Sequence, residues 1–235
     1  MSSTMSARIG SPPAATGAAA ATAAGLPAEA VAEAGGTSME WLETIGRTLG
    51  FSLAAGVNLY ATVAILGMAS RYGWVALPDQ FQIFDNPWII GAAGVLYVVE
   101  FIADKIPWVD SLWDSVHTLI RPVGGALVAV ASMGDMSPGM QAVIALLGGT
   151  VAAGAHVTKA GTRVAANASP EPFSNWILSF LGDGFVIGLA VITLNYPLVA
   201  LGISVTILVL IVLIVRKIWI WLRRPSPESA PSVPI

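Results

Sequence analysis

Long uncharged stretches, separated by isolated charged residues, make up most of the chain between residues 39 and 222. Residues 50–70 carry no charge and have the length of about 20 residues that a helix needs to cross a bilayer. Further stretches of this kind, with few charges, lie at 87–103, 111–133 and 138–158, and another begins near Phe173. Each of these stretches predicts a membrane-spanning helix.

The last uncharged run, 184–215, is too long for a single crossing of the bilayer. The sequence Asn195-Tyr196-Pro197 within it is typical of a turn, so we expect the run to contain the end of one span and most of the next. The whole pattern predicts an all-α fold, a polytopic membrane helix bundle of about six transmembrane helices.

Composition sets the expected domain boundaries. Residues 1–38 are mostly Ala, Gly, Ser, Thr and Pro, which predicts a disordered N-terminal tail, and Met39 is a second candidate start of the protein. Residues 39–222 form the predicted transmembrane domain. Residues 223–235 are rich in Pro and Ser and should form a disordered C-terminal tail.

A segment of the first predicted span recurs in the fourth. Residues 52–58 read SLAAGVN and residues 150–156 read TVAAGAH. We therefore expect repeat one at 39–135 and repeat two at 136–222, with three spans each, so that the second copy crosses the membrane in the opposite sense. Such 3+3 inverted repeats, with broken helices, are typical of transporters. The alternative is an old duplication kept because Ala and Gly let helices pack closely.

Composition agrees with a membrane protein and excludes several functions. Of the 235 residues, 55% are hydrophobic and only 11% are charged, whereas soluble domains have roughly 25% charged residues. Nucleic-acid binding is not expected, because no Lys/Arg-rich block with interleaved aromatic residues occurs. The chain has no Cys and lacks P-loop, HExxH, GxSxG and Rossmann glycine patterns. We therefore expect no cofactor, and a secondary transport mechanism rather than an enzyme.

Positive charges are divided unevenly between the two sides of the predicted bundle. With six spans, one side holds the N-terminal arm, the loops after spans two and four, and the C-terminus. That side carries Arg47, Lys105, Arg163, Arg216, Lys217, Arg223 and Arg224, whereas the opposite loops contribute only Arg71. The positive-inside rule then predicts a multi-pass protein of the inner (plasma) membrane with both termini in the cytoplasm.

The third predicted span carries an unusual polar stripe. Asp110, Asp114, His117 and Arg121 are spaced by four, three and four residues, which places them on one face of a helix. Pro122 predicts a break or kink in the span beside Arg121. An Arg at membrane depth normally faces the bundle interior, either paired with an acid or in contact with a ligand, and both readings stay open here.

A basic stripe lies at the end of the fourth span, where His156, Lys159 and Arg163 are spaced by three and four residues. His156 occupies the position that Asn58 has in the first copy of the repeat. Lys159 and Arg163 could equally anchor the helix at the interface, and Asn58 could form an interhelical hydrogen bond. The candidate substrate-binding residues are Arg121, His117, His156, Asn58, Lys159 and Arg163.

Acidic residues within the spans are candidates for carrying protons or a hard cation. Glu100 and Asp104 are four residues apart on one helical face, and Asp183 lies between two glycines, which predicts local unwinding of the fifth span. Ion pairs of Glu100 and Asp104 with Lys105 and His117 are the alternative. The candidate coupling residues are Glu100, Asp104, Asp114 and Asp183, and any metal ligands are unknown.

Three stretches resemble an uncharacterised family of bacterial multi-pass membrane proteins, classified only as a domain of unknown function. They are 41–60 (WLETIGRTLGFSLAAGVNLY), 100–107 (EFIADKIP) and 158–163 (TKAGTR). This resemblance covers about 39–222 and implies membrane location without an activity. The run 100–105 is also similar to the Glu-x-Gly-Asp-Lys/Arg-Thr/Ser signature of a duplicated family of manganese and calcium transporters. It departs from that signature in its acid spacing, in the missing Gly and Thr/Ser, and in having no second acidic copy.

Together these features predict a secondary transporter or lipid translocator for a small or lipid-linked anionic substrate. The alternatives are a divalent-cation transporter, an intramembrane lipid-modifying enzyme that uses Asp110, Asp114 and His117, and a noncatalytic membrane assembly factor. The expected partners are the lipid bilayer and an unidentified small-molecule, ion or lipid substrate, and a homo-oligomer stays open.

Overall fold

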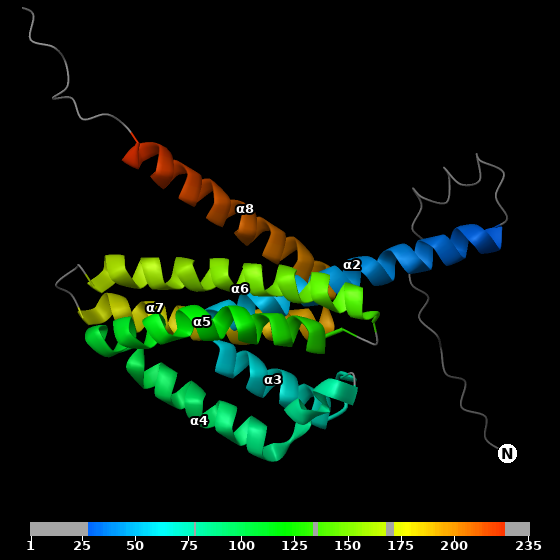
Figure 1. The fold of residues 1–235 in the computed structure, drawn as a ribbon, viewed down its shortest axis with the longest axis horizontal. Helices are drawn as coiled ribbons and strands as arrows, with labels where there is room; N and C mark the ends of the chain where they lie inside the picture. Colours follow the sequence, from blue (N-terminus) through cyan, green and yellow to red (C-terminus); the bar gives the residue numbers. More distant parts are fainter. Residues whose placement is uncertain (1–27, 78, 134–135, 168–171, 224–235) are drawn as a thin grey trace, which may run out of the picture. The chain divides into compact units, whose positions relative to one another are not determined.

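The computed structural model describes residues 28–77, 79–133, 136–167 and 172–223, and these residues form helices and connecting turns without any strand. The elements are α2 (Ala28–Val57), α3 (Leu59–Arg71), the short 3-10 helix η1 (Asp79–Asp85), α4 (Pro87–Ala103), α5 (Pro107–Ala131), α6 (Pro138–Asn167), α7 (Pro172–Asn195) and α8 (Pro197–Leu222). The all-α prediction is therefore confirmed (Figure 1).

Three of these helices are long and apolar enough to cross a membrane, within Pro138–Ala166, Asn175–Asn195 and Pro197–Ile220. Two more apolar helices, Leu59–Arg71 and Pro87–Ala103, are shorter. The protein is thus an integral membrane protein with a helical bundle. The chain divides into two units, Met1–Leu42 and Glu43–Ile235, and all further description concerns the second.

Several helix boundaries lie at the prolines and asparagines that predicted them. α4 begins at Pro87, where the Asn86 side chain caps the helix, and α7 gives way to α8 at Tyr196 as expected. α2 begins at Ala28, so residues 28–38 of the predicted disordered tail are helical, in agreement with the high helix propensity of their Ala and Glu residues. Residues 1–27 and 224–235 of the predicted tails lie outside the described residues.

The helix break lies in the first predicted span and not in the third or fifth. α5 continues through Pro122 and α7 continues through Asp183, so the predicted breaks there are wrong. A proline removes only one helical hydrogen bond, and α5 is held by α6 at close range: a Cβ added at Gly125 would overlap the Ala152 side chain. Asn58 instead has extended dihedral angles, and its side-chain oxygen accepts from the backbone N–H of Ala61, which caps the start of α3.

The chain turns back between α2 and α3 (Figure 1). α4 to α8 alternate in direction, so the starts of α4, α6 and α8 and the ends of α5 and α7 lie at one end of the bundle, which we call the Met133 end. The outer part of α2 is at this end, because Thr48 contacts Met133 and Gly46 lies against the Pro197 carbonyl. The outer end of α3 is there too, because Arg71 pairs with Asp85 just before α4. The opposite end is called the Arg163 end.

The repeated segments of α2 and α6 run in the same direction. Ser52 lies beside Gly148, and Gly56 lies against Ala152 and Ala155, so both chains advance together along the contact. An inverted repeat requires the two segments to be antiparallel, and in the structure they are parallel. The turn at Asn58 is the reason, because it brings the chain back before α4 and changes the number of crossings between the two segments.

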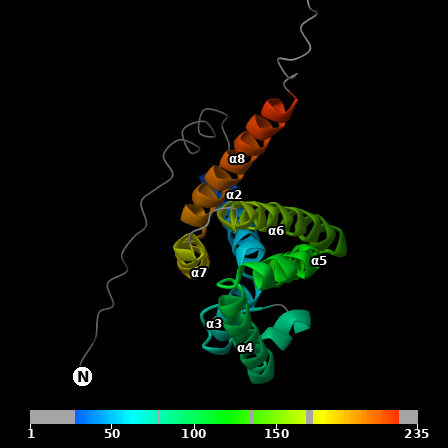
Figure 2. The same cartoon turned by 90° about the vertical axis from the view of Figure 1, so that its left-hand side faces the viewer.

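The last helix is the least covered. Only 11% of the most apolar window of α8 is buried, against 33% for α6 and for α7. In both views α8 leaves α6 and α7 toward its C-terminal end (Figures 1 and 2). Its long run of Leu, Ile and Val is suited to contact with lipid.

The turn at Asn58 can be tested by thiol labelling, because the chain contains no cysteine. We expect Glu43→Cys and Tyr72→Cys to react with a membrane-impermeant thiol reagent from the same side of sealed vesicles, and Arg223→Cys from the opposite side. If Glu43→Cys reacts from the side of Arg223→Cys, the segment from α2 to α3 crosses the membrane and the turn is wrong.

Candidate functional site

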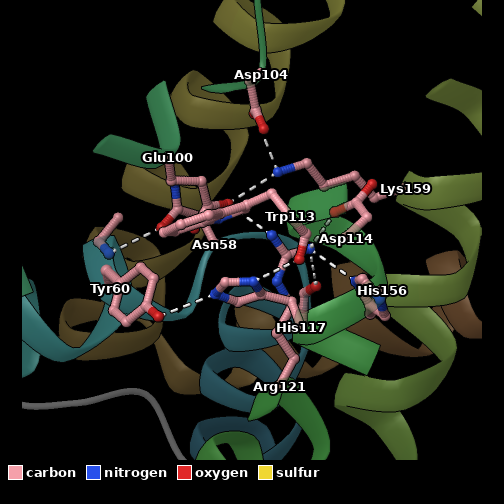
Figure 3. Close-up of polar contacts among 12 residues, drawn as sticks. Asn58, Tyr60, Glu100, Asp104, Trp113, Asp114, His117, Arg121, His156 and Lys159 are labelled. Carbon is pink, nitrogen blue, oxygen red and sulfur yellow. Dashed lines mark hydrogen bonds and ion pairs between the residues drawn. The ribbon is translucent and has the colours of Figure 1, made fainter. Parts of the chain in front are cut away.

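Charged side chains from three helices alternate in sign through the bundle interior. Helical spacing sets the arrangement: Glu100 and Asp104 lie one turn apart at the end of α4, and the stripes of α5 and α6 face them. Arg121 Nη2 donates to Glu100 Oε1 at 2.6 Å, and the same oxygen accepts from Lys159 Nζ at 2.9 Å. Both Arg121 and Glu100 are completely shielded from solvent. Figure 3 shows how these side chains lie relative to Lys159.

The alternation continues toward the Arg163 end. Lys159 Nζ lies 3.1 Å from Asp104 Oδ2, and Arg163 Nη2 lies 2.7 Å from the same oxygen. Arg163 also donates to the Asp104 carbonyl and pairs with Asp110 Oδ1 at 3.3 Å. We call this set the charge ladder, whose members in order are Arg121, Glu100, Lys159, Asp104, Arg163 and Asp110.

Both terminal nitrogens of Arg121 have protein partners, whereas its buried Nε has no hydrogen-bond partner among the described residues. Its Nη1 donates to the Gly56 carbonyl at 3.2 Å and to His156 Nδ1 at 2.8 Å, and lies 3.8 Å from Asp114 Oδ1. The Gly56 carbonyl is exposed to Arg121 because α2 ends nearby, one residue before Asn58. Of the two readings of Arg121, paired residue or ligand contact, these contacts favour pairing.

His156 is held as a single tautomer by its two neighbours. A guanidinium cannot accept a hydrogen bond, so Nδ1 must accept from Arg121 and the ring proton must lie on Nε2. Nε2 lies 3.2 Å from Thr118 Oγ1, whose own proton goes to the Asp114 carbonyl. His156 therefore links α5 and α6 beside the inner end of the charge ladder.

His117 points away from the ladder toward aromatic residues. Its Nδ1 lies 2.7 Å from the Trp113 carbonyl, and its Nε2 lies 2.9 Å from the Tyr60 hydroxyl (Figure 3). The ring also stacks on Trp113 at 4.7 Å between centroids. The alternative pairing of Glu100 with His117 or Lys105 is wrong, since Lys105 donates to the Phe101 carbonyl and to Ser179.

The helix break brings Asn58 to α7. The Asn58 side-chain nitrogen donates to Asp183 Oδ1 at 3.3 Å, while its oxygen caps α3. Asp183 is buried, and its other oxygen, Oδ2, has no hydrogen-bond partner among the described residues. The prediction of an interhelical hydrogen bond at Asn58 is confirmed.

Acids outnumber bases in this interior region. The charge ladder is neutral because it alternates three cations with three carboxylates. The buried Asp114 and Asp183 are called the excess acids because no cation of the ladder is left to balance them, and the partly buried Lys105, which interacts electrostatically with Asp183, is a further cation in the described part of the chain. Among the described residues, Asp114 has one cation, Arg121, within 4 Å, and at 3.8 Å that contact is too long for a hydrogen bond. Further buried carboxylate oxygens that have no hydrogen-bond partner in the described part of the chain are Glu100 Oε2, Asp104 Oδ1, Asp110 Oδ1 and Oδ2, and Asp114 Oδ1.

A polar cavity of about 230 Å³ reaches the acids between α5 and α6. Asp110, Asp114, Thr118 and Arg163 line it, so it touches the outer end of the ladder and one of the excess acids. Such a cavity is large enough for several water molecules and has the polar partners that water requires. Among the described residues, no three His, Asp or Glu side chains are grouped closely enough to hold a metal ion.

All the candidate residues identified from the sequence come together here, whatever their roles. Sequence reasoning missed Tyr60, Thr118 and the Gly56 carbonyl. A lone Tyr, a lone Thr and a backbone oxygen carry no signal of their own, and the turn that exposes the carbonyl depends on a single Asn.

A family profile described as a domain of unknown function (DUF4126) matches residues 45–217. The chain belongs to this family. The matched range includes every residue of the charge ladder, together with Asn58, Asp114 and Asp183. No curated protein and no solved structure matches this DUF4126 chain.

The Arg121–Glu100 pair should be a large contributor to stability. Replacing Arg121 with Met leaves Glu100 and Asp114 without that cation, and breaking a buried pair costs about 3–5 kcal/mol. We expect Arg121→Met to lower the unfolding temperature strongly in detergent, and Glu100→Gln with Arg121→Met to recover part of the loss. Arg47→Gln, which removes an exposed pair with Glu43, is the control and should change stability by less than about 1 kcal/mol. Equal stability of Arg121→Met and Arg47→Gln would contradict the ladder.

Proposed function

We propose that this DUF4126 protein is a secondary transporter coupled to protons, with Asp114 and Asp183 as the proton carriers. The observation that carries the proposal is that two buried carboxylates, Asp114 and Asp183, lie outside the charge ladder and, among the described residues, accept no hydrogen bond from a cation. Isolated ionised carboxylates are too costly to keep in a low-dielectric interior, so each must bind a proton or another cation. Intramembrane acids of this kind are typical of proton relays in transporters.

The polar cavity between α5 and α6 supports a route for the protons. It leads from the Arg163 end to Asp110 and Asp114, which share the side of α5 that faces Arg163. Asp183 lies where Asn58 turns the chain and accepts a hydrogen bond from the Asn58 side chain. A turn inside the bundle is a feature that transporters use to build a site from broken helices.

The contacts of the basic residues argue against a free anion site at Arg121. Arg121 and Arg163 are completely or almost completely buried and engaged with carboxylates. The predicted roles of Arg121 and His156 in binding an anion are therefore replaced in this proposal by roles in holding the acids. Lys159, whose side chain is 11% exposed, is the cation of the ladder most open to a substrate.

Two alternatives are less well supported. Divalent-cation transport needs converging oxygen or nitrogen ligands, and the described residues have no such group. An intramembrane enzyme built on Asp110, Asp114 and His117 needs the His close to the acids, whereas His117 faces Tyr60. A noncatalytic assembly factor would give the acids no separate activity, which the experiment below decides.

We further propose that the Arg163 end faces the cytoplasm in the inner membrane. Lys105, Arg216, Lys217 and Arg223 lie at or toward this end, whereas the Met133 end has Arg47 and Arg71. The positive-inside rule then supports a cytoplasmic C-terminus. This proposal keeps the expected cytoplasmic C-terminus, and with the turn at Asn58 it puts Glu43 on the opposite side of the membrane.

Proton coupling can be tested in proteoliposomes that contain a pH-sensitive dye. Organic anions, anionic amphiphiles, inorganic anions and cations are added one class at a time, and internal pH is recorded. We expect one class to move protons, and Asp114→Asn or Asp183→Asn to abolish the movement. Asp79→Asn, which changes an exposed acid in η1, is the matched control and should leave proton movement intact.

Two results would count against the proposal. One is the absence of proton movement with every class of solute, which would favour the assembly factor. The other is substrate-driven proton movement of normal rate in both Asp114→Asn and Asp183→Asn, because the protons would then travel without the two excess acids.

A further inference from the structure

A second, mostly apolar cavity lies on the other side of α6 from the polar one. Its volume is about 300 Å³, at the lower end of the usual range of roughly 300–1,000 Å³ for ligand pockets. Leu53 and Val57 of α2, Phe185 of α7, and Ile207 and Ile211 of α8 form apolar parts of its wall. Because Ile207 and Ile211 belong to α8, which has the smallest buried share of the three long apolar helices, the cavity borders the helix best suited to contact with lipid.

Two cations stand in this otherwise apolar wall. Lys159 and Arg163 both line the cavity while belonging to the charge ladder. The hydroxyls of Thr158 and Thr162, which also line it, already donate to carbonyls within α6. The polar chemistry that the wall offers to a ligand is therefore mainly positive charge at one place.

Lys159 can turn toward a ligand without stripping either of its carboxylate partners. Glu100 keeps Arg121 at 2.6 Å, and Asp104 keeps Arg163 at 2.7 Å. An ammonium has three protons; Lys159 donates one to Glu100, and its contact with Asp104 at 3.1 Å is an ion pair. A proton therefore remains for an anion in the cavity.

We propose that this cavity binds an anionic amphiphile, with a single hydrocarbon chain between α2, α7 and α8 and a phosphate or carboxylate head on Lys159. An apolar wall with one cationic position fits such a molecule, and it fits neither a free inorganic anion nor a neutral hydrocarbon as well. The assignment names the substrate class of the proposed transporter and rests on that proposed function.

The position of Lys159 also supplies the coupling. When the anionic head group binds Lys159, it partly neutralises a cation that otherwise compensates Glu100 and Asp104. The interior then carries a larger excess of carboxylate, which favours uptake of a proton through the polar cavity. Binding of the anion and uptake of a proton thus favour each other, as symport requires.

Binding can be measured on the full-length protein by native mass spectrometry from detergent. The probes are palmitate, palmitoyl lysophosphatidate and, as the uncharged match, hexadecanol. We expect at least one anionic probe to be retained about tenfold more strongly than hexadecanol, the effect of one charge-assisted contact. The anion that binds better identifies the head group as a carboxylate or a phosphate.

Matched variants separate the cavity from nonspecific binding. Ile211→Trp fills the cavity from α8, whereas Val212→Trp places the same side chain on the neighbouring position, which is 63% exposed. We expect loss of binding in the first and normal binding in the second. Lys159→Gln should remove the preference for anions, and Lys159→Arg should keep it. Thermal unfolding of each variant verifies that it is folded.

Equal retention of hexadecanol and both anions, or equal binding by Ile211→Trp and Val212→Trp, would overturn the assignment. This assay reads binding without a proton gradient, so its failure is separate from failure of proton coupling. If another solute drives protons through the protein while no amphiphile binds, the substrate assignment is wrong and the proposed proton coupling is not affected. If an amphiphile binds at Lys159 but no solute moves protons, the binding site is confirmed and the proposed function is wrong.

Discussion

The interior of the bundle depends on Glu100. A single oxygen of this carboxylate accepts from Arg121 at 2.6 Å and from Lys159 at 2.9 Å, with no access to solvent. A carboxylate removed from water is stable only with such compensation. Because the three residues belong to α4, α5 and α6, their pairing fixes how these helices face one another. Asp104, Arg163 and Asp110 then extend the same alternation toward the Arg163 end.

Much of the fold was predictable because its signals are local. Proline and asparagine mark the starts of α4 and α8 and the end of α7, and the three polar stripes follow helical spacing. The meeting of those stripes was predictable too, since charged residues at membrane depth must face the protein interior. Which acid pairs with which base was not, because partners such as Glu100 and Lys159 lie 59 positions apart.

The unpredicted features depend on long-range contacts. Asn58 turns the chain partly because Asp183, 125 positions away, accepts its amide proton. α5 stays continuous through Pro122, and at Gly125 it packs directly against Ala152 of α6. The matched segments of α2 and α6 are parallel because of the turn at Asn58. Residue similarity alone does not reveal that turn, so it wrongly predicted an inverted repeat. Local sequence near Asn58 or Pro122 holds no trace of these partners.

Lys159 connects the two halves of the functional account. It belongs to the neutral charge ladder, and it also lines the apolar cavity beside α8. An anionic ligand bound to Lys159 would weaken the stabilisation that this cation gives to the buried carboxylates, because electrostatic interactions are strong in an interior of low dielectric. In the proposed mechanism, substrate and proton are linked through the side chain of Lys159.

The central claim is that the excess carboxylates of the resting protein carry protons, and infrared spectroscopy measures this directly. In lipid at neutral pH, the protein should show the carbonyl band of protonated carboxylic acid, with a shift in heavy water. The band should weaken in the double variant Asp114→Asn with Asp183→Asn and persist in Asp79→Asn. A spectrum without that band at neutral pH, or one that the double variant leaves unchanged, would contradict the account.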